Sequence, residues 1–386
     1  MDWKAHAERL AETVTHPTSR WRPIIAGVPR HEFVPRWWTW REPAAGPYGA
    51  AVWDLADRKA DPAAWLEAAY TDRSRVTRVG TDHADSARPG STVAGSPTSS
   101  ATLPSLIVQM AQHALLTEGL DVLDVGTGSG YGAALLAARQ GDAHVTSVDV
   151  DPYLVSAAAA RLDRAGLRPE LRVVDATGPL EGSWDRIIAT VAVRPVPASW
   201  LAALRPGGRL VTTLAGTSLI LTADAAPGGG AEGRIEWQRA GFMEARHGGD
   251  YPPEIAAAIE AAHSAPGEDN GPGRFPVINV QESWEVWSML GVTAPGVHCD
   301  YEETEDGWRR AVLVHGDGSW ARAVGDASGT PRVHQGGPRR LWDVLEDIRA
   351  RWLRDGSLPI YGARAVIDPD GTIHLQRGRW SATIRE

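Results

Sequence analysis

Cysteine is almost absent from this sequence, and phenylalanine is scarce. The 386 residues include one cysteine, Cys299, and three phenylalanines, against 17 tryptophans. A single cysteine excludes a disulfide within the chain and a zinc site built from several cysteines. We therefore interpret Cys299 as a small buried apolar residue. We assign most tryptophans to the core and to domain contacts, with some of Trp37, Trp38 and Trp40 as candidates for lining a peptide groove.

Long apolar runs and long basic runs are also missing. No stretch approaches the roughly 18 apolar residues that a membrane-spanning helix needs, and the polar N-terminus does not resemble a signal peptide. Lysine and arginine total 39 against 48 acidic residues, a formal charge of −9, without the clustered cations that nucleic-acid phosphates require. We expect a cytoplasmic protein with no nucleic-acid or membrane partner. The sequence does not predict an oligomeric state.

A metal site is not expected either. His247, Asp250 and Glu254 are the nearest to a candidate ligand set. They lie in a loop at mixed spacing, unlike the regular spacing of protein metal sites. We therefore predict no metal ligands.

The most informative segment present is the glycine-rich run Asp124–Tyr131. It follows an apolar stretch from Leu120 and precedes a helical pattern that ends at Gly141. This order predicts a strand, a tight turn and a helix, whose first N–H groups have no partner within the helix. Such a turn binds a nucleoside-bearing cofactor at the carboxyl edge of a parallel sheet.

Polar residues end the next three predicted strands as well. Asp149 follows the strand from His144, about 20 residues beyond the glycine turn, where an acid that binds ribose hydroxyls is expected. Asp175 and Thr190 end the two later strands. Helix capping alone is the alternative reading of these acids. The repeated pattern predicts a doubly wound α/β sheet with a ligand site along one edge.

The spacing of these glycines separates two kinds of nucleoside-binding fold. Dinucleotide-binding proteins carry GxGxxG, whereas this chain has GxGxG with Asp124 two residues ahead. It therefore resembles the class I S-adenosylmethionine (SAM)-dependent methyltransferases, which have a Rossmann-like doubly wound sheet. The resemblance implies that Asp149 binds the ribose and that Asp175 contacts the adenine. The full set of cofactor-binding residues that it implies is Asp124, Gly126, Thr127, Gly128, Ser129, Gly130, Tyr131, Asp149, Val150, Asp175, Ala176 and Thr190.

Further motifs narrow the resemblance to one family. They are Phe33-Val-Pro35, Ala69-Tyr-Thr-Asp72, Thr98–Pro104, the glycine run, Trp184–Thr190 and Leu204–Leu210. In this order they resemble the protein-L-isoaspartate(D-aspartate) O-methyltransferases over residues 20 to about 245. Three features depart from the family: Thr102 replaces a serine, the 41–100 segment is long, and a domain follows residue 248. That extension resembles the long forms associated with ribosomally made modified peptides, the lanthipeptides and graspetides.

The resemblance implies that a side-chain carboxylate of aspartate or isoaspartate in a peptide or protein accepts the methyl group. A carboxylate is ionised at neutral pH, so no general base is required. We expect Ser99, Ser100 and Thr102 either to hold this carboxylate or only to cap the helix that follows. In the long forms the resemblance implies that the ester collapses to an aspartimide (succinimide). General isoaspartate repair and a non-enzymatic SAM-binding scaffold remain as alternatives.

Two other classes of methyl transfer are disfavoured by the sequence. N-methyltransferases usually carry an NPPY-type element, which is missing here. Cytosine methylation needs a cysteine preceded by proline, whereas His298 precedes Cys299.

We predict three regions. Residues 1–103 form a substrate-side region of helices and loops, with 41–100 as loops around a short helix at Pro62 to Ala69. Residues 104–248 form the SAM-binding core, beginning with a helix over 104–118 and ending in a hairpin. Residues 249–386 form a small α+β domain for substrate recognition, with hairpins near Asp317-Gly318 and Asp368–Gly371.

Overall fold

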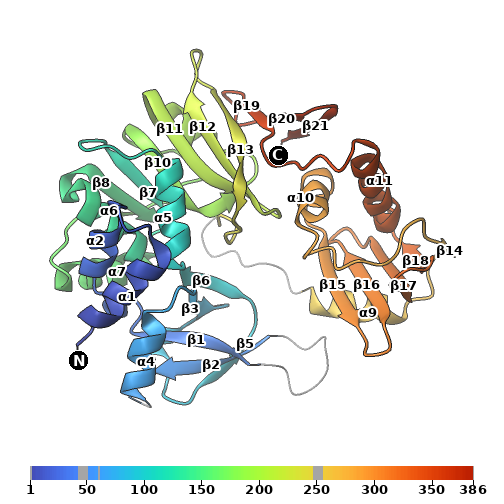
Figure 1. The fold of residues 1–386 in the computed structure, drawn as a ribbon, viewed down its shortest axis with the longest axis horizontal. Coiled ribbons are helices and arrows are strands. Elements are labelled where there is room, and N and C mark those ends of the chain that lie inside the picture. The colour runs from blue at the N-terminus through green and yellow to red at the C-terminus, as the bar shows by residue number, and fades with distance from the viewer. Residues whose placement is uncertain (1, 42–50, 60, 247–254, 386) are drawn as a thin grey trace.

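The computed structural model describes residues 2–41, 51–59, 61–246 and 255–385. Figure 1 shows a large sheet with helices, a small sheet before it in the sequence, and a second lobe on the C-terminal side. The helices are α1 (Lys4–Val14), α2 (Arg22–Gly27), α3 (Arg30–Phe33), α4 (Pro62–Ala69), α5 (Pro104–His113), α6 (Tyr131–Gln140), α7 (Pro152–Arg164), α8 (Ala198–Ala203), α9 (Ala256–Ser264), α10 (Trp284–Thr293) and α11 (Leu341–Arg354). Within the described residues, none of these helices has the length and apolar character needed to cross a membrane.

The large sheet confirms the predicted α/β fold class. Its strands are β7 (Val122–Val125), β8 (Val145–Asp149), β9 (Glu170–Val173), β10 (Trp184–Val193), β11 (Leu204–Leu214), β12 (Leu219–Ala225), β13 (Ala231–Arg239), β19 (Arg364–Ile367), β20 (Ile373–Arg377) and β21 (Trp380–Ile384). The order is β21-β20-β19-β13-β12-β11-β10-β7-β8-β9. Strands β9, β8, β7, β10 and β11 run parallel, and the others pair antiparallel. The chain therefore reverses its direction of travel across the sheet at β7, where ligands of such folds bind.

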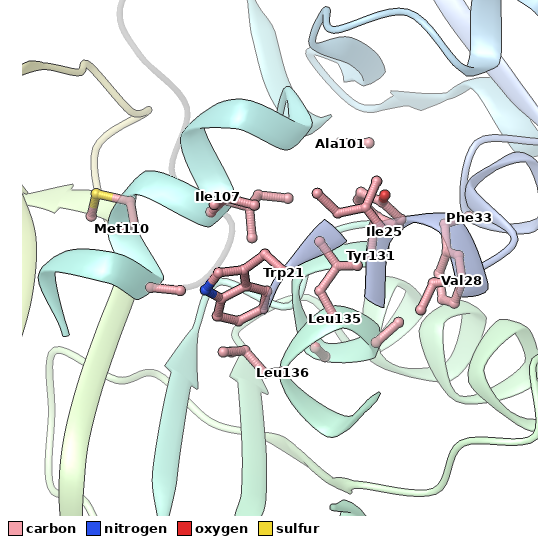
Figure 2. Packing of buried hydrophobic residues seen from close by; sticks show 14 of the residues in the cluster. Trp21, Ile25, Val28, Phe33, Ala101, Ile107, Met110, Tyr131, Leu135 and Leu136 are labelled. Atoms are coloured by element: carbon pink, nitrogen blue, oxygen red, sulfur yellow. The ribbon is translucent and has the colours of Figure 1, made fainter. Parts of the chain in front are cut away.

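Neighbouring residues of the central strands face opposite sides of this sheet. Val122 packs in the cluster with α2, α5 and α6, while Leu123 packs in the cluster with α8 and the C-terminal strands. Figure 2 shows the first cluster, in which Tyr131 and Leu135 of α6 lie against Trp21, Ile25 and Phe33. Both sides of the central strands are covered, so residues on both faces of β7 and β8 are buried, the polar Asp124 and Ser147 among them.

A second sheet lies where the sequence predicted loops. Its strands are β1 (Arg36–Arg41), β2 (Val52–Asp57), β3 (Arg75–Val79), β4 (Asp82–His83), β5 (Thr92–Ala94) and β6 (Pro97–Ala101). The order is β4-β3-β1-β2-β5, with β6 also paired to β3. The loop prediction for 41–100 was therefore wrong for the described residues that form β2 to β6. These strands are short, and the 41–100 segment that contains most of them is rich in Gly, Pro and Ser. The pairs β1–β3 and β3–β6 also join segments that are distant in sequence, so no local pattern revealed them.

The helix over 104–118 was also predicted too long. The α-helix ends at His113, and Leu115 has a left-handed backbone with φ of 52°. A leucine in that conformation cannot continue a right-handed helix. Of the three tryptophans considered for a peptide groove, Trp37 and Trp38 of β1 are buried and Trp40 is 53% exposed.

The C-terminal segment contributes to two bodies. A five-stranded antiparallel sheet contains β14 (Asp269–Pro272), β15 (His298–Glu303), β16 (Trp308–Val314), β17 (Trp320–Asp326) and β18 (Arg332–Gly336), in the order β14-β18-β17-β16-β15. Cys299 packs against its core, and burial raises the pKa of the thiol. Strands β19–β21, by contrast, extend the large sheet beside β13. The segment 249–386 was expected to form one domain. It is instead divided between the five-stranded C-terminal sheet and the edge of the large sheet (Figure 1).

Candidate active site

A pocket opens at the carboxyl end of β7, where the sheet order reverses. Its volume is about 300 Å³. The lining residues come from β6, the glycine run, the ends of β8, β9 and β10, and the segment 241–246. Of the expected residues, it includes Ser99, Ser100, Thr102, Gly126, Thr127, Gly128, Ser129, Tyr131, Asp149, Val150, Asp175, Ala176 and Thr190.

The glycine run keeps its shape through contacts that a side chain would block. Gly126 has φ of +98°, and a Cβ there would lie 3.0 Å from Thr190 Oγ1. The Thr190 hydroxyl donates to the Gly126 carbonyl at 3.1 Å. Gly130 does not line the pocket; its position has φ of +88°, and a Cβ would lie 2.9 Å from Ala158 Cβ. Gly130 therefore allows α7 to pack closely against the turn.

Asp124 also lies behind the pocket rather than in it. Its carboxylate accepts a hydrogen bond from Ser147 Oγ at 2.7 Å, and Ser147 Oγ is 2.6 Å from Thr127 Oγ1. Burial raises the pKa of Asp124 to about 7. Asp124 therefore supports the turn from beneath, through Ser147 and Thr127, instead of meeting a ligand.

Asp149 ends β8 and faces the turn. Its Oδ2 accepts from the Gly128 N–H at 2.8 Å, and its Oδ1 accepts from the Asp151 N–H at 3.1 Å. Burial raises the pKa of Asp149, while these two hydrogen bonds oppose the rise. Each carboxylate oxygen has more than one lone pair, so Asp149 can still accept hydrogen bonds from a pair of ligand hydroxyls.

The loop after β9 presents the second acid, Asp175. Its Oδ1 accepts from the Thr177 N–H at 3.0 Å. Trp200, fully buried beneath this loop, donates from Nε1 to the Ala176 carbonyl at 2.6 Å. The two carboxylates and the first turn of α6 thus surround one cavity with acceptors and donors suited to a nucleoside-bearing cofactor.

Strand β6 carries Ser99 and Ser100 on the other side of the pocket, and Thr102 follows directly after the strand. None of Ser99, Ser100 and Thr102 caps α5: the N-cap is Leu103, and the Ser105 N–H donates to Asp72 Oδ1 at 2.9 Å. The capping alternative is therefore wrong. Ser99 Oγ accepts from Thr77 Oγ1 of β3 at 3.0 Å, which fixes β6 against the sheet that the sequence failed to reveal.

The small N-terminal sheet is tied to the cofactor side of the pocket. Arg78 of β3 pairs with Asp151, which caps α7, at 2.7 Å. Arg161 of α7 pairs with Asp85, which also accepts from Tyr153 Oη at 3.1 Å. Sequence spacing could not reveal these ion pairs, because their members lie more than 60 residues apart.

Segment 241–246 also lines the pocket. The sequence did not predict that this segment belongs to the site. The Ala192 N–H donates to the Met243 carbonyl at 2.9 Å, and the Ala245 N–H donates to the Ala192 carbonyl at 2.8 Å. These bonds hold the segment along the end of β10. Among the described lining residues, Arg246 is the cation, and its charge opposes the rise in the pKa of Asp149.

Within the described parts of the chain, no three His, Cys, Asp or Glu side chains gather in a group that could hold a metal ion. The candidate ligands named from sequence, His247, Asp250 and Glu254, lie outside the described residues.

Comparison with known proteins finds matches to part of this chain. Residues 64–220 match the family model described as protein-L-isoaspartate(D-aspartate) O-methyltransferase (PCMT). The protein-L-isoaspartate O-methyltransferase of Hyperthermus butylicus is 34% identical over 120 residues, covering 28% of this chain and 50% of the relative. That of Thermococcus onnurineus is 37% identical over 112 residues, with the same two coverages. A solved protein-L-isoaspartate O-methyltransferase covers 99% of this chain and 98% of its own, at 16% identity and a TM-score of 0.47.

The sequence matches cover only part of the chain. This chain spans about half the length of the curated relatives that it matches. The family model begins within α4 and ends at the start of β12. It therefore covers β6, the glycine turn and the strand ends that line the pocket, while β13, segment 241–246 and the C-terminal lobe lie beyond it.

Proposed function

We propose that this protein is a SAM-dependent O-methyltransferase that esterifies the side-chain carboxylate of an aspartyl or isoaspartyl residue in a peptide. One observation carries the proposal: a single pocket at the reversal point of the sheet contains the glycine turn, two strand-end acids and the β6 hydroxyls. The match of residues 64–220 to the isoaspartate methyltransferase model supports it.

The residues at the base of the pocket fit the cofactor. Gly128 has φ of +50°, a conformation that favours glycine, and even a Cβ there would already be in contact with the Ser100 carbonyl oxygen at 3.5 Å. Asp149 would accept hydrogen bonds from ribose hydroxyls, and the loop at Asp175 and Ala176 would flank the adenine. When bound, SAM supplies an electrophilic methyl group on a sulfonium.

The chain's own task is then to position a carboxylate and exclude water. A carboxylate needs no base at neutral pH, and displacement at a methyl carbon depends on alignment of the reacting atoms. Ser100 and Thr102 are the proposed hydroxyl donors to that carboxylate, with Ser99 anchored beneath them by Thr77. Arg246 is positioned to offset the negative charge that three carboxylates place in the lining.

We favour a dedicated peptide over general repair as the substrate. The support is the second lobe, whose helix α10 lies against the carboxyl edge of the large sheet: a Cβ at Gly291 would be 2.2 Å from the Gly216 carbonyl oxygen. A methyl ester of aspartate in such a peptide activates its side-chain carbonyl. Attack by the following backbone nitrogen then releases methanol and leaves a succinimide.

Mass spectrometry with SAM and two acceptors tests the proposal. One acceptor is a generic isoaspartyl peptide, and the other is a cyclised aspartyl precursor peptide from the same genome. A gain of one methyl group on the precursor alone, followed by loss of methanol, is the result expected for a dedicated modifying enzyme. Modification of the isoaspartyl peptide alone would indicate repair. Retained cofactor binding without modification of either peptide would indicate a scaffold and overturn the enzymatic proposal.

A further inference from the structure

Two tryptophans and two arginines alternate along the exposed end of β13 and its neighbours. The Arg239 guanidinium lies 3.4 Å from the ring centroid of Trp284 on α10, and that of Arg377 on β20 lies 5.3 Å from the ring centroid of Trp237. Trp237 and Arg239 are two residues apart on one strand, so their side chains leave the same face. We name these four residues the arginine–tryptophan ladder.

The ladder is exposed although it is rich in aromatic surface. Trp237 is 59% exposed and Trp284 is 37% exposed. At position 362 a glycine leaves room beside the Trp237 ring, because a Cβ there would be 3.0 Å from Trp237 Cζ2. Large exposed aromatic groups beside arginines are typical of protein-binding surfaces rather than of solvated ones.

The positive charge of the ladder favours an acidic partner. Within the described residues, neither Arg239 nor Arg377 is paired with a carboxylate, although many other arginines are. Glu285 is an acid near Arg239, because both charges act on Tyr361: Glu285 adds to the rise that burial causes in the pKa of Tyr361, and Arg239 opposes it. Arg377 lines a cavity with Asp347, Asp355, Arg351 and Arg354. Counting these groups with Arg239 and Glu285, four arginines stand against three acids, which leaves a positive surface on a chain with a formal charge of −9.

The ladder is continuous with the proposed active site. Arg239 is the last residue of β13, and Gly241, two residues later, already lines the pocket. The two Cα atoms can therefore be at most about 7 Å apart. The other side of the ladder, α10, is fixed to the same edge of the sheet by hydrogen bonds from Arg194 to the Gly291 and Val292 carbonyls.

We propose that the arginine–tryptophan ladder binds an acidic segment of the peptide substrate beside the methyl-transfer pocket. This inference rests on the proposed function and extends it to substrate selection. Carboxylates of the segment pair with Arg239 and Arg377, while its apolar atoms lie against Trp237 and Trp284. These contacts are distant from the reacting atoms, so they act on substrate affinity.

Methylation kinetics with matched peptides test the ladder. Three acceptors share one modified core and carry either no extension, an extension rich in glutamate, or a neutral extension of equal length. In the natural sequence we expect the acidic extension to raise kcat/KM by about tenfold through KM, as two partly exposed charge pairs would allow. Arg239→Ala should reduce this gain to about threefold or less, and Arg239→Lys should retain more of it. Trp308→Ala removes a tryptophan that is 52% exposed on β16 of the five-stranded C-terminal sheet. This variant should leave the gain intact.

A binding experiment separates failure of the ladder from failure of the proposed function. Fluorescence anisotropy of the labelled acidic peptide is measured on the full chain with S-adenosylhomocysteine present. Arg239-dependent binding without methylation would sink the methyltransferase assignment yet support an acidic-peptide surface. Equal gain from acidic and neutral extensions, equal binding by the Arg239→Ala variant, or displacement by an RNA oligonucleotide at lower concentration than by unlabelled peptide would overturn the ladder's role.

Discussion

Arg194 Nη1 donates to the carbonyl oxygen of Gly291 at 3.0 Å, although the two residues are 97 positions apart in the chain. Arg194 follows β10 at the pocket, and Gly291 lies in the last turn of α10. The last carbonyls of a helix lack partners within it and carry partial negative charge, so an arginine there satisfies and stabilises them. This contact joins the C-terminal lobe to the strand end that lines the site.

Arg194→Ala should loosen α10. Hydrogen bonds to charged groups each contribute about 1.5–3 kcal/mol, and this substitution removes two. We expect faster amide exchange in α10 and a lower melting temperature. Arg168→Ala provides the control, because Arg168 is 79% exposed in its pair with Asp163. Unchanged exchange in α10 would contradict the anchoring role.

Gly291→Ala tests the same contact sterically. Alanine normally favours a helix by about 1 kcal/mol over glycine, but its Cβ would lie 2.2 Å from the Gly216 carbonyl oxygen. We expect a net destabilisation of about 1–3 kcal/mol, as for other overpacked sites, measured by chemical denaturation. Gly316→Ala, where a Cβ meets nothing within 4 Å, should change stability little. A stabilised Gly291→Ala variant would mean that α10 does not pack against the turn.

The buried Asp124 should make stability depend on pH. Its pKa is raised to about 7 by burial, so the folded chain retains a proton that the unfolded chain loses near its ordinary pKa. The stabilisation is complete below about pH 4 and is lost as pH rises toward 7, at up to about 1.4 kcal/mol per unit. Asp124→Asn should flatten that part of the profile, whereas the exposed Asp163→Asn should not. Parallel curves for the natural chain and Asp124→Asn would refute the assignment.

Asp149→Ala should weaken cofactor binding. Loss of a charged hydrogen-bonding partner costs about 1.5–3 kcal/mol, which is roughly ten- to a hundredfold in Kd. Isothermal titration with S-adenosylhomocysteine measures the change, with Asp163→Ala on α7 as the matched control. Equal affinity in the two variants would remove Asp149 from the cofactor site.

The hydroxyls of Ser100 and Thr102 should affect the acceptor and not the cofactor. Ser100→Ala and Thr102→Val are each expected to lower kcat for a carboxylate acceptor by about tenfold through poorer alignment. Affinity for S-adenosylhomocysteine should stay within about twofold, because neither substitution removes a residue assigned to cofactor binding. Thr13→Val on α1 serves as the control for a lost surface hydroxyl. If both pocket variants retain full kcat, the hydroxyls do not position the acceptor.

The C-terminal segment contributes strands to the large sheet as well as forming the lobe. Ile367, Ile373 and Leu375 of β19 and β20 are buried in the core beneath β13. A chain ended at residue 248 would expose that core as well as lose the lobe. Point variants of the ladder therefore separate recognition from folding, which truncation cannot do.

Local sequence determined the centre of the molecule. The glycine run, the strand-end acids and the apolar stretches between 120 and 214 predict the parallel sheet and its ligand edge, because each signal lies within a few residues of the structure that it specifies. The hairpins at Asp317-Gly318 and Asp368–Gly371 followed from turn chemistry in the same way.

Only the tertiary structure decided what surrounds that centre. The sheet that carries β6 forms from strands of two to six residues, paired partly with distant segments, and its ion pairs to α7 join residues on separate elements. The placement of Asp124 behind the turn, of β19–β21 on the large sheet, and of Arg239 above Trp284 likewise depends on contacts across long stretches of chain. Such contacts arise when the whole chain buries its apolar surface, so no short pattern records them.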